Sequence, residues 1–108
     1  MENERRIFER FSAQFPAKFK DNRNEFGTDV YLRDASVSGA RISSRERLYP
    51  NDEVALQVEV PDGGDPMLLQ GRVKWSIAGQ EPMWDIGVEF LEPNFMKMQR
   101  LFKFTLQS

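Results

Sequence analysis

The stretch EVALQVEV, residues 53–60, decides the class of fold. Valine or leucine occupies every second position from 54 to 60, and charged or polar residues stand at 53, 57 and 59. A period of two places the apolar side chains on one face of a β-strand, with the polar ones opposite. We therefore expect a strand with one face in a core and the other in water.

Five further segments show the same alternation. In chain order, their apolar residues are Phe15, Ala17 and Phe19; Val30 and Leu32, with an end near Asp34; Ala40 and Ile42; Leu69, Val73, Trp75 and Ile77; and Ile86, Val88 and Phe90. Turn-forming clusters separate some of them, at YPND (49–52) and PDGGDP (61–66). Six short strands with tight turns favour a closed antiparallel barrel, because closure removes exposed sheet edges.

The segment after Pro93 changes to helical spacing. The residues expected on its apolar face are Phe95, Met98, Leu101, Phe102 and Leu106, enough to cap one end of a barrel. Met96 and Phe104 project onto the opposite, basic side, which carries Lys97, Arg100 and Lys103. Exposed apolar groups mark interaction sites, so this face is expected to dock a partner protein.

The length and composition fit a single all-β domain. A chain of 108 residues has room for one core, and 40% hydrophobic residues exclude a disordered protein. We expect one domain over 1–108, with an N-terminal arm over 1–12, a barrel over 13–91 and a C-terminal helix over 93–106.

The residue types that are missing narrow the chemistry. The chain has no cysteine and no histidine, which excludes disulfides and thiolate catalysis and removes the commonest general base and metal ligand. Ser36 stands near Asp34, but no histidine can activate it. The two carboxylates of the loop 62–65 are too few for calcium, and we interpret that loop as a turn. We expect no enzyme activity, no metal and no cofactor.

The charge distribution indicates a small anionic ligand. The net charge of −2 disfavours nucleic acid as a partner, whereas residues 1–20 hold five basic against three acidic side chains. No apolar run approaches the roughly 20 residues that span a bilayer, and no apolar stretch follows the N-terminal basic pair as in a signal peptide. We expect a cytoplasmic protein without membrane insertion.

Two short motifs carry the binding chemistry. Arg6 and Arg10 frame RIFER (6–10), and DASVSG (34–39) contains Asp34, Ser36 and Gly39. Arginine pairs bidentately with phosphate oxygens and with the O6/N7 edge of guanine. A carboxylate accepts hydrogen bonds from base N–H groups, and a serine hydroxyl serves a phosphate or its own turn. Glycine permits a close backbone approach.

In this order and spacing, the motifs resemble the R-x-x-x-R and D/N-x-S-x-x-G signature of PilZ domains, bacterial receptors for cyclic di-GMP. The resemblance runs from residue 4 to about 104 and includes GRVKW (71–75) and DIGVEF (85–90). It implies a six-stranded antiparallel barrel with a C-terminal helix. It also implies a cyclic di-GMP site built from Arg6, Arg10, Asp34, Ser36 and Gly39, and Arg5 is expected to add a phosphate contact.

Two questions stay open on the sequence. Trp75 stands two residues from both Val73 and Ile77, which favours a side chain on the same inward face of the strand, with the indole in the core. Near a barrel mouth the ring would instead stack on a guanine. The chain is either a cyclic di-GMP receptor whose ordered arm signals to a partner protein, or a PilZ-like interaction module of the type IV pilus or motility kind with little or no nucleotide binding.

Overall fold

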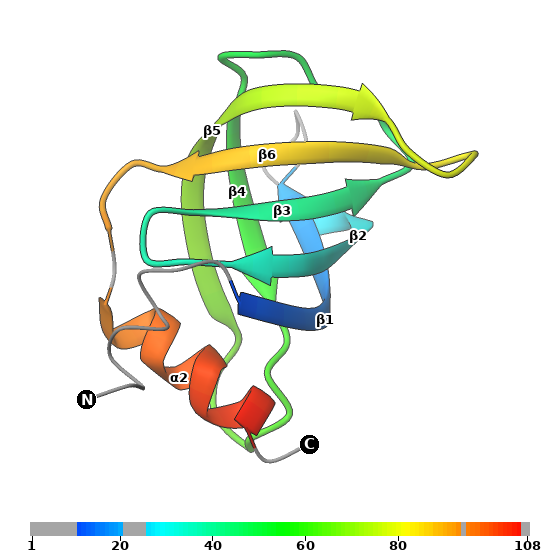
Figure 1. The fold of residues 1–108 in the computed structure, drawn as a ribbon. Helices are drawn as coiled ribbons and strands as arrows, with labels where there is room; N and C mark the ends of the chain where they lie inside the picture. Colours follow the sequence, from blue (N-terminus) through cyan, green and yellow to red (C-terminus); the bar gives the residue numbers. More distant parts are fainter. Residues whose placement is uncertain (1–10, 21–25, 94, 107–108) are drawn as a thin grey trace.

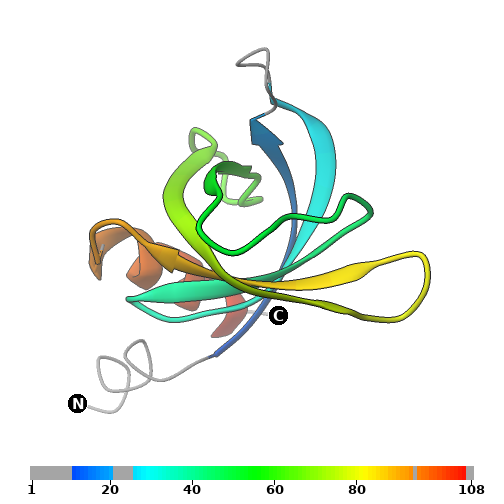
Figure 2. The ribbon, with the colours of Figure 1, turned by 90° about the horizontal axis from the view of Figure 1, so that it is seen from above.

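The computed structural model describes residues 11–20, 26–93 and 95–106, and for 26–28 and 104–106 it describes the backbone alone. In chain order its elements are β1 (Phe11–Lys20), β2 (Phe26–Ala35), β3 (Gly39–Ser44), β4 (Glu53–Val58), β5 (Met67–Ala78), β6 (Trp84–Phe90) and α2 (Phe95–Leu106). The strands close into one antiparallel barrel in the order β1-β2-β3-β6-β5-β4 (Figures 1 and 2). The expected six-stranded barrel with a C-terminal helix is confirmed.

The barrel interior is filled by the apolar half of each alternating strand. β1 alternates strictly between buried and exposed side chains over its ten residues. In β4, Val54, Leu56 and Val58 point inward, and Val60 is buried just beyond the end of the strand. The period-two stretch therefore forms the strand that was expected from it.

Helix α2 closes one end of the barrel, below the strands in Figure 1. Met98 and Leu101 are fully buried, and the rings of Phe102 and Phe11 meet edge to face with their centroids 5.2 Å apart. Because Phe11 also pairs with Ala35 of β2, the barrel begins at Phe11 and not after an arm ending at 12. The helix begins at Phe95, two residues later than expected, because the chain first bends at 91–92 to turn from β6 toward the barrel end. Among the described residues, no helix is long and apolar enough to cross a membrane.

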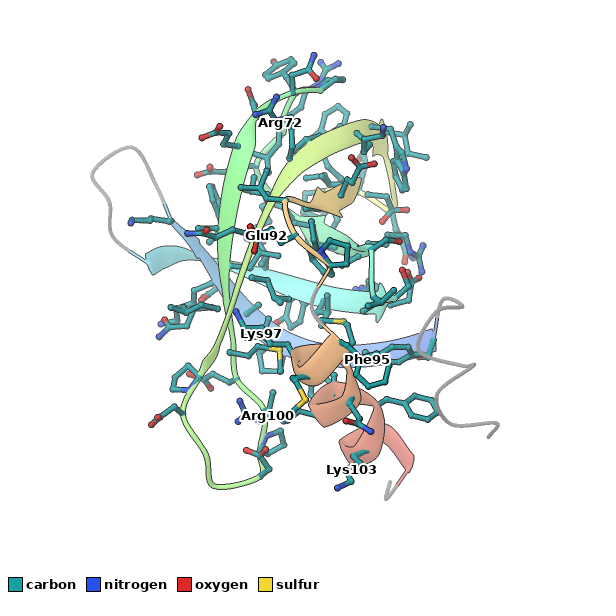
Figure 3. All side chains as sticks on the ribbon, turned by 90° about the vertical axis from the view of Figure 1, so that its left-hand side faces the viewer. Arg72, Glu92, Phe95, Lys97, Arg100 and Lys103 are labelled. Atoms are coloured by element: carbon teal, nitrogen blue, oxygen red, sulfur yellow. The ribbon has the colours of Figure 1, made fainter. Side chains whose placement is uncertain are left out.

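Two basic side chains of α2 hold the neighbouring strand and loop (Figure 3). Lys97 donates to the carbonyl oxygen of Leu68 on β5. Arg100 donates to both carboxylate oxygens of Asp62, at 2.6 and 2.7 Å, and to the carbonyl oxygen of Asp65 at 2.8 Å. These bonds, with one from the Gly64 N–H, lower the pKa of Asp62 well below its ordinary value. The loop 61–66 is thus a turn with one internal bond, from Gly64 to Asp62, and it is bonded to helix α2 through Arg100.

A bulge in β5 corrects one expectation. Val73 pairs with Val88, but the next pair is Trp75 with Gly87, so Lys74 is an extra residue on β5. A bulge lets two consecutive side chains point the same way, and the parity of the strand is reversed beyond it. Trp75 is therefore 38% exposed on the outside of the barrel, and Ile77 is exposed as well. The interpretation of Trp75 as a core indole was wrong.

Candidate functional site

The turn between β2 and β3 holds the second motif. The Ser36 N–H donates to the Gly39 carbonyl oxygen at 2.8 Å, and the buried Ser36 hydroxyl lies 3.5 Å from the same oxygen and 3.3 Å from the Ser38 hydroxyl. Ser36 therefore stabilises its own turn in this structure. The hydroxyl is an O–H rotor with two acceptor lone pairs, so it retains the capacity to turn toward a ligand.

Gly39 is required by the packing of two backbones. It pairs with Glu89 of β6, and an added Cβ would lie 2.5 Å from the carbonyl oxygen of Val88. Real side chains do not tolerate such a contact with backbone. The glycine of the motif therefore has a structural reason to be present, independent of any ligand.

The carboxylate of Asp34 is mostly covered and paired. Its side chain is 15% exposed, and its Oδ2 accepts a hydrogen bond from Nε of Arg41 on β3 at 2.9 Å. Another nitrogen of the same guanidinium lies 4.0 Å from Oδ2 of Asp85 on β6. A bulge in β2 sets up this arrangement: Leu32 pairs with Ile42 and Asp34 with Arg41, so Arg33 is the extra residue.

Arg33 joins the same polar network from the bulge. Its Nε donates to the hydroxyl of Ser43 at 2.9 Å, and that hydroxyl lies 3.4 Å from Oδ1 of Asp85. A cavity of about 410 Å³ opens here, which is within the size range of small-molecule sites. Its lining residues are Gln14, Arg33, Arg41, Ser43, Gln80, Glu81, Met83 and Asp85.

One row of paired residues links Asp34 to Trp75 across the outside of the barrel. We call it the outer row; it consists of Ser12, Asp34, Arg41, Gly87 and Trp75, each paired with the next on the neighbouring strand. The four strands β2, β3, β6 and β5 lie side by side in Figure 1. At about 4.8 Å per strand, the Cα atoms of Asp34 and Trp75 are about 14 Å apart.

The indole of Trp75 covers Gly87. A Cβ built on Gly87 would lie 2.3 Å from the Cε2 and Nε1 atoms of the ring. The indole ring of Trp75 therefore extends from β5 over Gly87 on β6, the residue that pairs with Arg41. The ring lies one strand nearer to Asp34 than the backbone of Trp75 does. The missing Cβ of Gly87 creates the space for this contact.

The structure brings together some of the predicted residues. Asp34, Ser36 and Gly39 lie at one end of the β2–β3 pair, and Trp75 lies on the same outer row as Asp34. Arg5, Arg6 and Arg10 fall outside the described residues. Sequence reasoning missed Arg33, Arg41, Asp85 and Gly87. The outward position of Arg41, between the inward Ala40 and Ile42, was visible in the alternation.

The described part of this face is close to electrically neutral. The cations Arg33 and Arg41 are bonded to, or lie near, the anions Asp34 and Asp85. Lys74 and Glu89 form a further pair at 3.3 Å beside the outer row. An anionic ligand therefore needs cations in addition to these to bind tightly.

The comparison with protein families decides the family. The model described as PilZ domain matches residues 4–107, nearly the whole chain. The chain belongs to the PilZ domain family. This is a family of non-enzymatic cyclic di-GMP receptors, in agreement with the resemblance carried by the two motifs.

Solved structures show the same fold at low sequence identity. The PilZ domain of YcgR from Escherichia coli, solved with c-di-GMP, is 18% identical with a TM-score of 0.66; the match covers 91% of this chain and 89% of that one. MotI/DgrA, an inhibitor of motility from Bacillus subtilis, is 11% identical with a TM-score of 0.63, covering 91% and 48%. The MrkH–c-di-GMP complex from K. pneumonia is 15% identical with a TM-score of 0.60, covering 91% and 49%.

The PilZ chain spans about half the length of the MotI and MrkH chains. At these identities, the likeness establishes the fold alone. The comparison with curated proteins found no match.

Proposed function

We propose that this PilZ domain is a non-enzymatic cytoplasmic receptor that binds cyclic di-GMP through Arg6, Arg10, Asp34, Ser36 and Gly39. The observation that carries the proposal is the register of β1 on β2. Phe11 pairs with Ala35 and Ser12 with Asp34. Arg10 directly precedes Phe11 in the chain, and consecutive Cα atoms lie about 3.8 Å apart. The arginine motif therefore leads into the strand end that pairs with β2 at Ala35 and Asp34, and this supports the proposal.

The phosphates of the ligand are the reason for including that arm in the proposal. Cyclic di-GMP carries two phosphates, whereas Arg41 of the described face is paired with Asp34 and lies near Asp85. The segment 1–10 adds three arginines, at positions 5, 6 and 10, together with three glutamates, at 2, 4 and 9, so it contributes guanidinium groups and not a net positive charge. An arginine fork pairs with two phosphate oxygens at once, which makes Arg6 and Arg10 the phosphate ligands of the proposal and Arg5 an additional one.

The outer row supplies the contacts for a base. Asp34 accepts hydrogen bonds from guanine N–H groups, and the half-exposed indole of Trp75 offers a stacking surface beside Arg41. Stacking of a base on an aromatic side chain contributes about 1–3 kcal/mol. Three or four charge-assisted hydrogen bonds contribute about 1.5–3 kcal/mol each, and the cost of ordering the arm reduces their sum. The resulting binding free energy, near −8 kcal/mol, corresponds to a dissociation constant of about 1 μM. The YcgR and MrkH structures, both solved with c-di-GMP, support the same class of ligand.

Ordering of the arm on ligand binding is the proposed signal. An order–disorder change of a segment is an established route from ligand to output. The new surface would engage a partner protein, for which Met96 of α2 is a docking candidate because it is 74% exposed. The side chain of Phe104, the second candidate on that helix face, is outside the described residues. Residues 1–108 act as one domain in this proposal.

Calorimetric titration tests the proposal. Wild type is expected to bind cyclic di-GMP and to bind GMP and cyclic di-AMP much more weakly. Arg6→Ala and Arg10→Ala should each weaken binding at least about tenfold, equal to about 1.4 kcal/mol. Arg72→Ala is the matched control, because Arg72 is an exposed barrel arginine paired with Glu53 at 3.2 Å. Wild-type affinity in both arm variants would remove the arm from the site.

A second candidate function is a protein-interaction module with little or no nucleotide binding, of the type IV pilus or motility kind. The exposed Leu68, Leu91 and Met96 favour it. Nucleotide titration separates the two. Unchanged amide resonances around Asp34 and Gly39 at saturating cyclic di-GMP would support the interaction module and contradict the receptor.

A further inference from the structure

The Asp34–Arg41 pair presents hydrogen-bonding groups of both kinds side by side. Nε of Arg41 donates to Oδ2 of Asp34 at 2.9 Å, so the guanidinium and the carboxylate share one edge. A guanidinium has five N–H groups and a carboxylate about four acceptor sites, so each partner can bond several groups at once. The side chain of Arg41 is 41% exposed, so its other N–H groups are within reach of a ligand.

This array is complementary to one edge of guanine. The Watson–Crick edge of guanine presents two neighbouring donors, N2–H and N1–H, followed by the acceptor O6. A carboxylate next to a guanidinium presents acceptors followed by donors. We infer that Asp34 and Arg41 recognise one guanine together: Asp34 accepts from N1–H and N2–H while Arg41 donates to O6. This inference rests on the proposed function and makes Arg41 a specificity-determining residue of that site.

The same array rejects adenine. Adenine has an unprotonated N1, an acceptor that would face the carboxylate, and an amino group, a donor that would face the guanidinium. Acceptor would face acceptor and donor would face donor. Leaving such groups buried without a partner costs more free energy than one hydrogen bond normally contributes to binding. The Asp34–Arg41 pair therefore accounts for discrimination between cyclic di-GMP and cyclic di-AMP.

The neighbours of Arg41 hold it in the required place. Asp85 lies 4.0 Å from the guanidinium on the side away from Asp34, and Ser43 lies 3.4 Å from Asp85. The next residue of the outer row, Gly87, carries the indole of Trp75. A guanine at Asp34 and Arg41 would thus meet an aromatic surface next to the groups that bind its edge.

A purely structural ion pair between β2 and β3 would behave differently. Pairs that are partly exposed contribute about 0–1 kcal/mol, and lysine can replace arginine in them. In the proposed site, Arg41 donates to the Asp34 carboxylate and to guanine O6 at the same time. This requires the planar guanidinium with its several N–H groups, which lysine lacks. Arg41→Lys therefore separates the two roles, and Arg41→Ala removes both.

The test is a set of calorimetric titrations with cyclic di-GMP, cyclic di-AMP and cyclic di-IMP, whose base keeps N1–H and O6 but lacks the 2-amino group. For cyclic di-GMP, Arg41→Ala and Arg41→Lys should each lose at least about tenfold in affinity, the value of one good base contact. They should lose the same factor for cyclic di-IMP and little for cyclic di-AMP, so that the preference for guanine falls. Arg72→Ala is the control and should bind like wild type. Thermal unfolding of each variant confirms that it is folded at the temperature of the titration.

The outcomes separate this inference from the function on which it rests. Wild-type affinity for cyclic di-GMP in Arg41→Lys, or an unchanged preference over cyclic di-AMP in Arg41→Ala, would overturn the role of Arg41 and leave the receptor proposal intact. Absence of binding by wild type itself would overturn the receptor proposal and the inference together.

Discussion

The indole of Trp75 lies against Gly87, which has no side chain to keep it away. A Cβ on Gly87 would come within 2.3 Å of two ring atoms. Gly87 pairs with Arg41, and Arg41 with Asp34, so the position of the ring and the position of the carboxylate are set by the same row of strand pairs.

Substitution of Gly87 should therefore displace Trp75. In Gly87→Ala we expect a shift in the Trp75 emission, measured in a Trp84→Phe background. We also expect a loss of cyclic di-GMP affinity of about fivefold or more, because stacking on a base contributes about 1–3 kcal/mol. Trp75→Ala should lose a similar amount, and the double variant should lose little more than either single variant. Fully additive losses would show that Gly87 and Trp75 act independently.

Gly39→Ala should destabilise the protein even without ligand. The added methyl group meets the carbonyl oxygen of Val88 at 2.5 Å, and backbone cannot move aside as a flexible side chain can. Overpacking of this kind typically costs about 1–3 kcal/mol. Urea unfolding measures it as a lower midpoint. A midpoint equal to that of wild type would contradict the close approach of β3 and β6.

The Asp62–Arg100 pair predicts a dependence of stability on pH. The hydrogen bonds from Arg100 lower the pKa of Asp62 below its ordinary value of 3.8, so the folded state favours the ionised carboxylate. The stabilisation is present above pH 3.8 and is lost as the pH falls further and Asp62 becomes protonated. Arg100→Gln should reduce the fall in melting temperature between about pH 4 and pH 2.

Asp62→Asn provides the check on that prediction. It removes the titrating group from the same pair, so it should reduce the acid dependence as Arg100→Gln does, and the double variant should show no further change. An acid dependence identical to that of wild type in both single variants would show that the pair makes no contribution.

Helix α2 should contribute a large share of the stability of the barrel. Leu101 is fully buried where the helix covers the barrel end. Truncation of a buried leucine costs about 2–5 kcal/mol through lost transfer free energy and the cavity that remains. Leu101→Ala should lower the free energy of unfolding by that amount, whereas Lys103→Ala on the exposed side should change it by less than about 0.5 kcal/mol. Equal effects of the two substitutions would contradict the packing of this helix.

The sequence was sufficient for the architecture because the alternation of apolar residues is local. EVALQVEV and the helical spacing after Pro93 each predicted the right type of element. The side chain of Trp75 was assigned to the wrong face because one extra residue, Lys74, reverses the alternation of inward and outward side chains along β5. The pattern of apolar residues in the sequence does not reveal such a bulge.

The part of the candidate site that is local in the chain was predictable. Asp34, Ser36 and Gly39 lie at or beside the turn between β2 and β3, and all three belong to one sequence motif. The approach of Arg41 to Asp85 depends on the register of β3 on β6, two strands that are distant in the chain, and the approach of Trp75 to Gly87 depends on the bulge in β5 where it pairs with β6. Register is fixed by packing and bulges together, which a single sequence does not display.

The most direct measurement is an amide nitrogen–proton correlation spectrum recorded while cyclic di-GMP is titrated to saturation. The receptor proposal predicts large shifts for residues 36–39, for Arg41 and Gly87, and for the indole N–H of Trp75, with smaller changes at Arg72. Saturating ligand that leaves the turn 36–39 and the outer row unchanged would contradict it.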